Sequence, residues 1–211
     1  MGPRNLKTGL LLLYGLILVV SCIRPLYPRE MYLQHSATVI MGAFLVYVTI
    51  KNNLSNKAFV LIFAFMVLHI IGARWIYSYT PYDSWIKSLT GFSINDYFGW
   101  ERNQYDRFLH LMFGFLLLIP ASEIYNKWLG VPARHSDHIA CLFILAGSLF
   151  YEVFEWFITL VLSPEQADSY NGQQGDFWDA QKDMALAMLG ALVMIVIRKI
   201  KEKVKDLRNQ V

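Results

Sequence analysis

"WDAQKDMALAMLGALVMIVIRKI", residues 178–200, joins an acidic start to a long apolar run. Asp179 and Asp183 are four residues apart, so both lie on one face of a helix. Small residues then follow on the side suited to close helix packing, at Ala187, Gly190 and Ala191. A helix needs roughly 20 predominantly apolar residues to span the hydrocarbon of a bilayer. The stretch therefore predicts a membrane-spanning helix near 178–198 with carboxylates at one end.

The rest of the chain is similarly apolar. Of its 211 residues 55% are hydrophobic, and the mean hydropathy of +0.36 is too high for a soluble domain. Polar, proline- or glycine-bearing joints separate further apolar stretches near 8–25, 32–51, 56–78, 104–125 and 137–163. The two cysteines, Cys22 and Cys141, imply no disulfide framework. We predict an all-α fold: one polytopic membrane domain over residues 1–211, built as a six-transmembrane-helix bundle.

Basic residues set the predicted orientation. If the N-terminus is cytoplasmic, the inner segments hold most of the 19 Lys and Arg residues, as expected of cytoplasmic loops. The basic tail at 198–211 supplies much of this excess, and the inner loops lean the same way. We therefore predict a multi-pass protein of the bacterial inner (plasma) membrane with both termini cytoplasmic. The net charge of +3 points to no nucleic-acid partner; the bilayer is the predicted partner, and the oligomeric state stays open.

The N-terminal run and the segment at 80–103 allow more specific predictions. The N-terminal run that ends at Cys22 has a basic start, an apolar centre and a small residue before the cysteine, the outline of a cleaved lipoprotein signal. Arg24 and Arg29 also fit an ordinary loop after a retained first helix. Residues 80–103 are long for a plain connection and amphipathic. We predict that they lie along the membrane interface as an outer lid-like segment.

Three of the predicted spans carry a polar pair on one helix face. The pairs are Asp106 with His110, Glu152 with Glu155, and Asp179 with Asp183. At a rise of about 1.5 Å per residue, the deeper members of these pairs reach one layer about 8–15 Å below the outer ends of their helices. Carboxylates facing lipid are costly, so these groups are expected to face the bundle interior and to pair with something.

The acids at this layer outnumber the nearby cations, which are Arg74, Arg102, Arg107 and Lys182. A bound divalent cation would resolve the deficit. Imidazole with carboxylates suits Zn, Mn or Fe, whereas oxygen ligands alone would favour Mg or Ca. The predicted metal ligands are Asp106, His110, Glu152, Asp179 and Asp183, and Glu155 joins them as a predicted catalytic residue. Arg102, Arg107 and Arg74 are predicted to hold a substrate phosphate.

Structural interpretations of the same residues remain open. Asp176 and Asp179 suit the start of a helix, where acids interact well with the helix dipole. Asp106 with Arg107, or Glu152 with Arg102 or Arg74, can be intramembrane ion pairs that fix helix packing. A buried His110 bonded to a backbone carbonyl is the alternative to a ligand role.

Three motifs resemble those of the YjdF-like family of bacterial inner-membrane proteins: "RNQYDRFLH" (102–110), "YEVFEW" (151–156) and "GQQGDFWDAQKDM" (172–184). The resemblance runs from about the third predicted helix onward. Relatives often have "GGHYTY" where this chain has "GARWIY" (72–77), so Arg74 replaces a family histidine. A more distant similarity is to VanZ-like proteins. The resemblance implies the fold, the topology and the position of the site rather than an activity.

Three functions fit these observations. The first is a metal-dependent hydrolase or transferase acting on a lipid or lipid-linked substrate at the outer leaflet. The second is an ion-coupled transporter whose acids bind protons or cations, although the inner halves of the last three predicted spans are nearly devoid of polar groups. The third is a non-catalytic membrane scaffold that is held together by a structural polar cluster.

Overall fold

The computed structural model of the protein describes residues 3–161 and 174–209. Within these ranges every regular element is an α-helix, which confirms the all-α part of the predicted fold class, whereas the count of six spans stays a prediction. The helices are α1 (Pro3–Ser21), α2 (Pro28–Lys51), α3 (Asn56–Arg74), α4 (Tyr82–Thr90), α5 (Ile94–Phe98), α6 (Tyr105–Leu129), α7 (Ala133–Thr159) and α9 (Asp179–Arg208).

Five of these helices, α1, α2, α3, α6 and α7, are long and apolar enough to cross a membrane. The sixth predicted span corresponds to α9, which is not among the five; charged residues flank its apolar run at 184–197 on both sides. The predicted tail at 198–211 continues α9 as helix up to Arg208. The predicted end of the fifth span near residue 163 lies outside the described residues.

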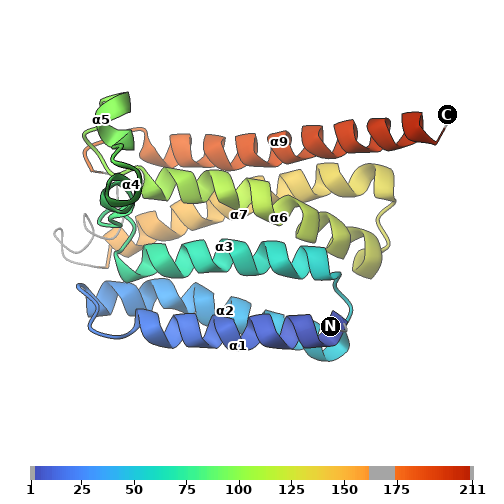
Figure 1. Cartoon of the computed structure of the whole chain (residues 1–211), viewed down its shortest axis with the longest axis horizontal. Helices are drawn as coiled ribbons and strands as arrows, with labels where there is room; N and C mark the ends of the chain where they lie inside the picture. Colours follow the sequence, from blue (N-terminus) through green and yellow to red (C-terminus); the bar gives the residue numbers. More distant parts are fainter. Residues whose placement is uncertain (1–2, 162–173, 210–211) are drawn as a thin grey trace.

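The long helices lie side by side in one bundle (Figure 1). One group consists of α1, α2 and α3, the other of α6, α7 and α9, and α3 packs against α6 between them. Both termini lie at the same end, which we call the terminus end. The opposite end, called the site end, carries α4, α5 and the starts of α6 and α9. Which end faces the cytoplasm stays a prediction.

Two glycines bring α6 and α9 into backbone contact. A Cβ atom at Gly114 would lie 1.9 Å from the carbonyl oxygen of Ala187, and one at Gly190 would lie 2.1 Å from that of Leu111. Neither position can therefore accept a larger side chain unless the helices separate. Close approach through small residues is a common way to associate helices in lipid, where burial of apolar surface gives no driving force. This contact fixes the position of the first turns of α9 relative to α6.

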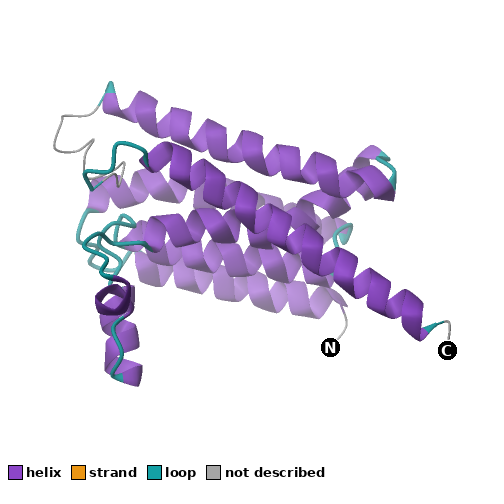
Figure 2. Ribbon diagram, turned by 90° about the horizontal axis from the view of Figure 1, so that it is seen from above, coloured by secondary structure: helices purple, strands orange, loops and turns teal. Residues whose placement is uncertain are grey.

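Residues 80–103 form a short arm rather than a cover over the bundle end. The arm contains α4 and α5, which pack chiefly against each other. Figure 2 shows it projecting sideways from the site end, on the side of the bundle opposite α7. Inside the arm, the backbone N–H of Asn95 donates to Asp83 at 3.0 Å, and this bond holds the pKa of Asp83 below its ordinary value. Exposed apolar side chains such as Leu89 and Tyr97 suit a position along the membrane interface.

The half-buried carboxylates at the terminus end have cationic partners. Arg198 Nη1 donates to Asp137 Oδ1 at 2.5 Å, and this link joins α9 to α7. Ser122 of α6 donates to the same carboxylate at 2.5 Å. Glu123 accepts from Lys127 at 2.9 Å and from the backbone N–H of Ser55 at 2.7 Å. Each carboxylate here thus has a cation and a hydroxyl or amide donor.

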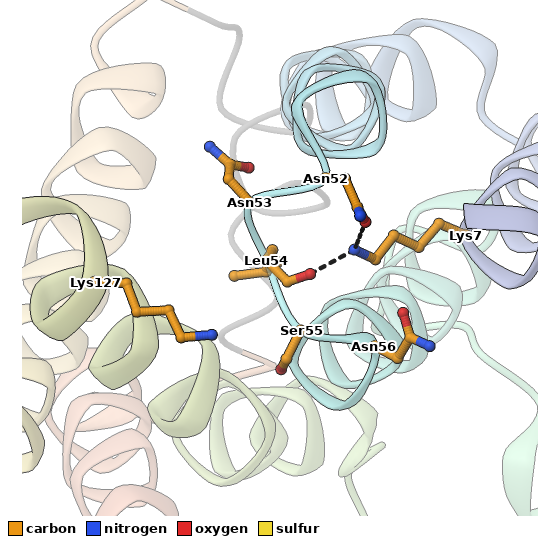
Figure 3. Close-up of a pocket in the computed structure, with 7 residues that line it drawn as sticks. All are labelled: Lys7, Asn52, Asn53, Leu54, Ser55, Asn56 and Lys127. Carbon is orange, nitrogen blue, oxygen red and sulfur yellow. Dashed lines mark hydrogen bonds between the residues drawn. The ribbon is translucent and has the colours of Figure 1, made fainter. Parts of the chain in front are cut away.

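A polar pocket of about 530 Å³ lies at the same end (Figure 3). Lys7 is 2% exposed, and its Nζ donates to Asn52 Oδ1 at 2.7 Å and to the carbonyl of Leu54 at 2.5 Å. These bonds tie α1 to the turn between α2 and α3, as the dashed lines in Figure 3 show. We therefore interpret the polar lining of this pocket as structural, because Lys7 binds the loop between α2 and α3 there.

Candidate functional site

At the site end, three helices bring polar side chains to one buried cluster. Asp106 and His110 come from α6, Glu152 from α7 and Asp183 from α9. His110 Nε2 lies 3.8 Å from Asp106 Oδ1 and 3.4 Å from Glu152 Oε1. One ligand atom each of Asp106, His110 and Asp183 lie within 4.8 Å of one another. We call these four residues the acid–histidine cluster.

The cluster is shielded from solvent and short of partners. Asp106 is 6% exposed, His110 8% and Asp183 2%. Among the described residues, no Lys or Arg forms an ion pair with Asp106, Glu152 or Asp183, and Asp183 Oδ1 and Glu152 Oε1 have no hydrogen-bond partner. Because an isolated buried carboxylate is costly, such groups bind either protons or a cation.

A second row of acids, Asp176 and Asp179, lies at the start of α9, one turn or more before Asp183, and binds the arginines. Asp179 accepts from Arg102 Nη1 at 2.5 Å and from Arg107 Nη2 at 3.0 Å. Asp176 accepts from Lys182 at 2.6 Å and also from Arg107. The bond from Lys182, followed by that from the Trp178 backbone and that from Arg107, keeps the pKa of Asp176 below its ordinary value. Arg102, Arg107 and Lys182 are thus paired with Asp176 and Asp179 rather than with the acids of the cluster.

The structure therefore separates the predicted site residues into groups. Asp106, His110, Glu152 and Asp183 lie together, whereas Asp179 forms ion pairs with Arg102 and Arg107. Glu155 is buried on α7, one turn beyond Glu152; neither glutamate belongs to the three converging residues, and only Glu152 has a contact with His110, at 3.4 Å. The two ion pairs considered for Asp106 and Glu152 do not form among the described residues.

Arg74 is placed away from the cluster. Its Nη1 donates to the backbone carbonyls of Ser21 at 2.6 Å and Ile23 at 2.9 Å, at the C-terminal end of α1. Carbonyls at a helix end lack intrahelical partners, and a cation there also interacts well with the helix dipole. Arg74 thus caps α1. This position corrects the expectation that Arg74 holds a substrate phosphate at the cluster.

Sequence reasoning missed Ser148, whose Oγ lies 3.5 Å from His110 Nδ1. Ser148 precedes Glu152 by four residues and therefore shares its helix face, so the spacing alone carried a signal. The hydroxyl sits on the ring nitrogen that points away from Asp106 and Glu152. A partner in this position orients an imidazole and selects its tautomer, as partners behind metal-bound histidines commonly do.

A cavity of about 440 Å³ adjoins the cluster. Asp106 and His110 form part of its wall, and most of the remaining wall is apolar. Its volume lies within the range of roughly 300–1,000 Å³ that is usual for small-molecule sites. The cluster is therefore reachable from an apolar space inside the bundle.

The donor set fits a divalent cation. Zinc ligands lie about 2.0–2.2 Å from the metal, so tetrahedral donors are roughly 3.3–3.6 Å apart. The observed 3.4 Å and 3.8 Å separations around His110 Nε2 need only small side-chain shifts to meet that geometry. One imidazole with carboxylates suits Zn, Mn or Fe better than Mg or Ca.

A bundle of apolar helices that encloses a buried acid–histidine cluster defines a polytopic membrane protein with an internal polar site. The chain belongs to the family described as "Predicted membrane protein (DUF2238)", whose profile matches residues 6–203. It is 29% identical over 195 residues to "Inner membrane protein YjdF" of Escherichia coli (strain K12), covering 92% of this chain and 88% of that protein.

These comparisons confirm the YjdF-like resemblance, and the VanZ-like similarity stays a prediction. Together with the apolar helices, they support a multi-pass protein of the bacterial inner membrane. No solved structure matches the chain.

Proposed function

We propose that the protein is a metal-dependent hydrolase or transferase that acts on a lipid or lipid-linked substrate. The observation that carries this proposal is the convergence of Asp106, His110 and Asp183, whose ligand atoms lie within 4.8 Å of one another without a Lys or Arg partner among the described residues. Networks that serve packing alone usually pair buried acids with cations. An unpaired, buried set of metal-ligand types favours a cation as the missing partner.

Each residue of the cluster then has a role. Asp106, His110 Nε2 and Asp183 hold the ion, and Ser148 orients the imidazole ring. Glu152, at 3.4 Å from His110 Nε2, serves as a fourth ligand or as a general base. A divalent ion at this position supplies Lewis-acid activation of water or of a phosphoryl or acyl oxygen.

The arginine row supports substrate binding rather than chemistry. Asp179 binds Arg102 and Arg107 one helical turn from the cluster, and this pairing replaces the metal-ligand role expected for Asp179. Arg107 Nε is buried and has no hydrogen-bond partner among the described residues, so it can donate to an oxyanion of the substrate headgroup.

Elemental analysis of the purified protein tests the proposal. We expect a near-stoichiometric transition metal in the wild type, and its loss in Asp183→Asn and His110→Gln. Asp96→Asn is the matched control, because Asp96 is an exposed acid on the arm whose one ion pair among the described residues is with Lys87. Absence of metal from the wild type, together with no binding of added Zn²⁺ or Mn²⁺, would overturn the proposal.

Ion-coupled transport is less well supported by the described core. Between the cluster and the polar contacts of the terminus end, the buried side chains of α6, α7 and α9 are apolar, as at Leu118, Ile144 and Ala191. A through-path for ions would need polar groups at this depth. The scaffold alternative makes a different prediction from the enzyme. It predicts that the purified protein contains no metal and that every cluster variant has a lower thermal stability.

A further inference from the structure

The cavity beside the acid–histidine cluster has the shape of a cleft between helices. Its two walls are faces of α2 and α7, and its floor comes from α3 and α6. The α2 wall uses residues spaced three or four apart, namely Leu33, Ala37 and Ile40. The α7 wall repeats that spacing with Gly147, Phe150 and Phe154. The regular spacing means that each wall is one continuous helix face.

The cleft runs along the helix axes and opens sideways. On α6 it extends from Asp106 to Leu117, a distance of about 16 Å at 1.5 Å per residue. Ile40 and Phe150, which line it from opposite walls, are 72% and 74% exposed, so the opening lies on the surface that faces lipid. Lipid chains in the adjoining leaflet run in the same direction as these helices.

A polar group sits among the apolar walls. Gln34 is 2% exposed, and its Oε1 accepts from the hydroxyl of Tyr151 at 3.2 Å, which bridges α2 and α7. Gln34 is one of the residues that line the cleft, and its Nε2 has no hydrogen-bond partner among the described residues. A buried N–H without an acceptor costs about 1–3 kcal/mol. An ester or phosphate oxygen of an amphiphile would supply the acceptor.

We propose that one hydrocarbon chain of a lipid or lipid-linked molecule enters this cleft sideways, between α2 and α7. Its head-group oxygen then meets Gln34, and its reacting group lies beside His110. The cleft has a volume of about 440 Å³ and extends about 16 Å along α6, which suits one hydrocarbon chain lying parallel to the helices. The status of this chain as part of the substrate rests on the proposed function, whereas its binding requires no metal.

Photolabelling of the full-length protein in nanodiscs tests chain binding. One probe is a phosphatidylglycerol with a diazirine at the end of one acyl chain, and the other is a diazirine analogue of farnesyl phosphate. We expect label on Met41, Phe113 and Leu117, which line the cleft, at severalfold higher yield than on the lipid-facing Leu142. The probe with the higher yield identifies the chain as acyl or prenyl.

Two obstructing variants and one control complete the test. Ala37→Phe and Ser36→Phe place a ring at the mouth from an exposed position on α2, and each should lower labelling in the cleft severalfold. Val39→Phe adds the same ring on the same helix, 61% exposed and outside the cleft lining, and should leave labelling unchanged. Equal labelling of the cleft and of lipid-facing helices, or no loss in either obstructing variant, overturns the proposal.

Repeating the labelling with Asp183→Asn in EDTA separates the two proposals. We expect chain labelling to persist there, because Gln34 and the apolar walls are unchanged. Labelling of the cleft in a wild type that binds no metal would contradict the proposed function and support the chain site. Metal binding by a wild type whose cleft is not labelled would support the proposed function and contradict the chain site.

Discussion

The carboxylates at the two ends of the bundle differ in their partners. At the terminus end, Asp137 has Arg198 and Ser122 as partners, and Glu123 has Lys127 and Ser55. At the site end, Asp106, Glu152 and Asp183 have no Lys or Arg partner among the described residues. Helices α6 and α7 carry carboxylates of both sets, whereas α9 carries Asp183 at the site end and Arg198 at the terminus end.

The contrast does not arise from a shortage of cations at the site end. Arg102 and Arg107 lie just above the cluster, but Asp176 and Asp179 hold them there. The upper acids thus keep the arginines from neutralising the lower ones. An arrangement that serves only packing would match each such acid with a donor, as the terminus end does. The site end instead leaves Asp106, which lines the cavity, without a Lys or Arg partner among the described residues.

The largest effect is expected where α6 and α9 meet. Gly190→Ala would place a Cβ 2.1 Å from the carbonyl of Leu111, so the helices must separate. We expect a loss of about 3 kcal/mol of stability, at the upper end for overpacking, and a loss of the cluster with it. Gly15→Ala, where nothing lies within 4 Å, is the control and should lose no stability. Unchanged thermal unfolding of Gly190→Ala in detergent would show that the helices do not touch there.

Metal binding should distinguish the two ends next. At a Zn²⁺ or Mn²⁺ concentration of about 100 times Kd, binding to the folded state stabilises it by about 2.7 kcal/mol. We therefore expect added metal to raise the thermal midpoint of the wild type and of Asp137→Asn. It should not raise that of Asp183→Asn. Differential scanning fluorimetry with and without EDTA measures it. A metal response that survives in Asp183→Asn would place the ion elsewhere.

Neutralising one charge should act in opposite directions at the two ends. Arg198→Gln leaves the Asp137 carboxylate without its cation, so we expect a loss of about 1–2 kcal/mol in this partly exposed pair. Asp183→Asn removes a carboxylate that has no cation, so the metal-free protein should unfold at the same temperature or higher. Unfolding is followed in EDTA for both. Destabilisation by Asp183→Asn as large as that by Arg198→Gln would favour the scaffold alternative.

The smallest effect concerns pH and the upper row of acids. Lys182, the Trp178 backbone and Arg107 lower the pKa of Asp176, so its contribution to stability is present above the ordinary carboxyl pKa of about 3.9. That contribution is lost only as the pH falls below this value toward the lowered pKa. The thermal midpoints of wild type and Asp176→Asn should therefore differ at pH 7 and converge below pH 4. A constant difference down to pH 3 would contradict the pairing.

Much of the site was predictable because helix spacing and depth are local properties. Asp106 and His110 share a face by their four-residue spacing, and alternating helix direction brings Asp183 to the same layer. Glu152 follows from the same count along α7. The role of Asp179 was not predictable in this way, since one turn of α9 separates an acid that meets arginines from one that does not.

Arg74 shows a second limit. Its place near the end of α3 is readable, but the C-terminal end of α1 that it caps lies some 50 residues earlier. The lid-like segment shows a third, because amphipathic composition predicts an interfacial position and leaves its direction open. Figure 2 shows that direction to be sideways, away from α7.

The sequence by itself determined the helices and the depth of each charged side chain, because hydropathy and the rise per residue act within one segment. Only the tertiary structure decided which acids meet cations, since that depends on how each helix is rotated against its neighbours. It also decided the cleft between α2 and α7 and the backbone contact at Gly114 and Gly190, which require segments far apart in sequence to pack side by side.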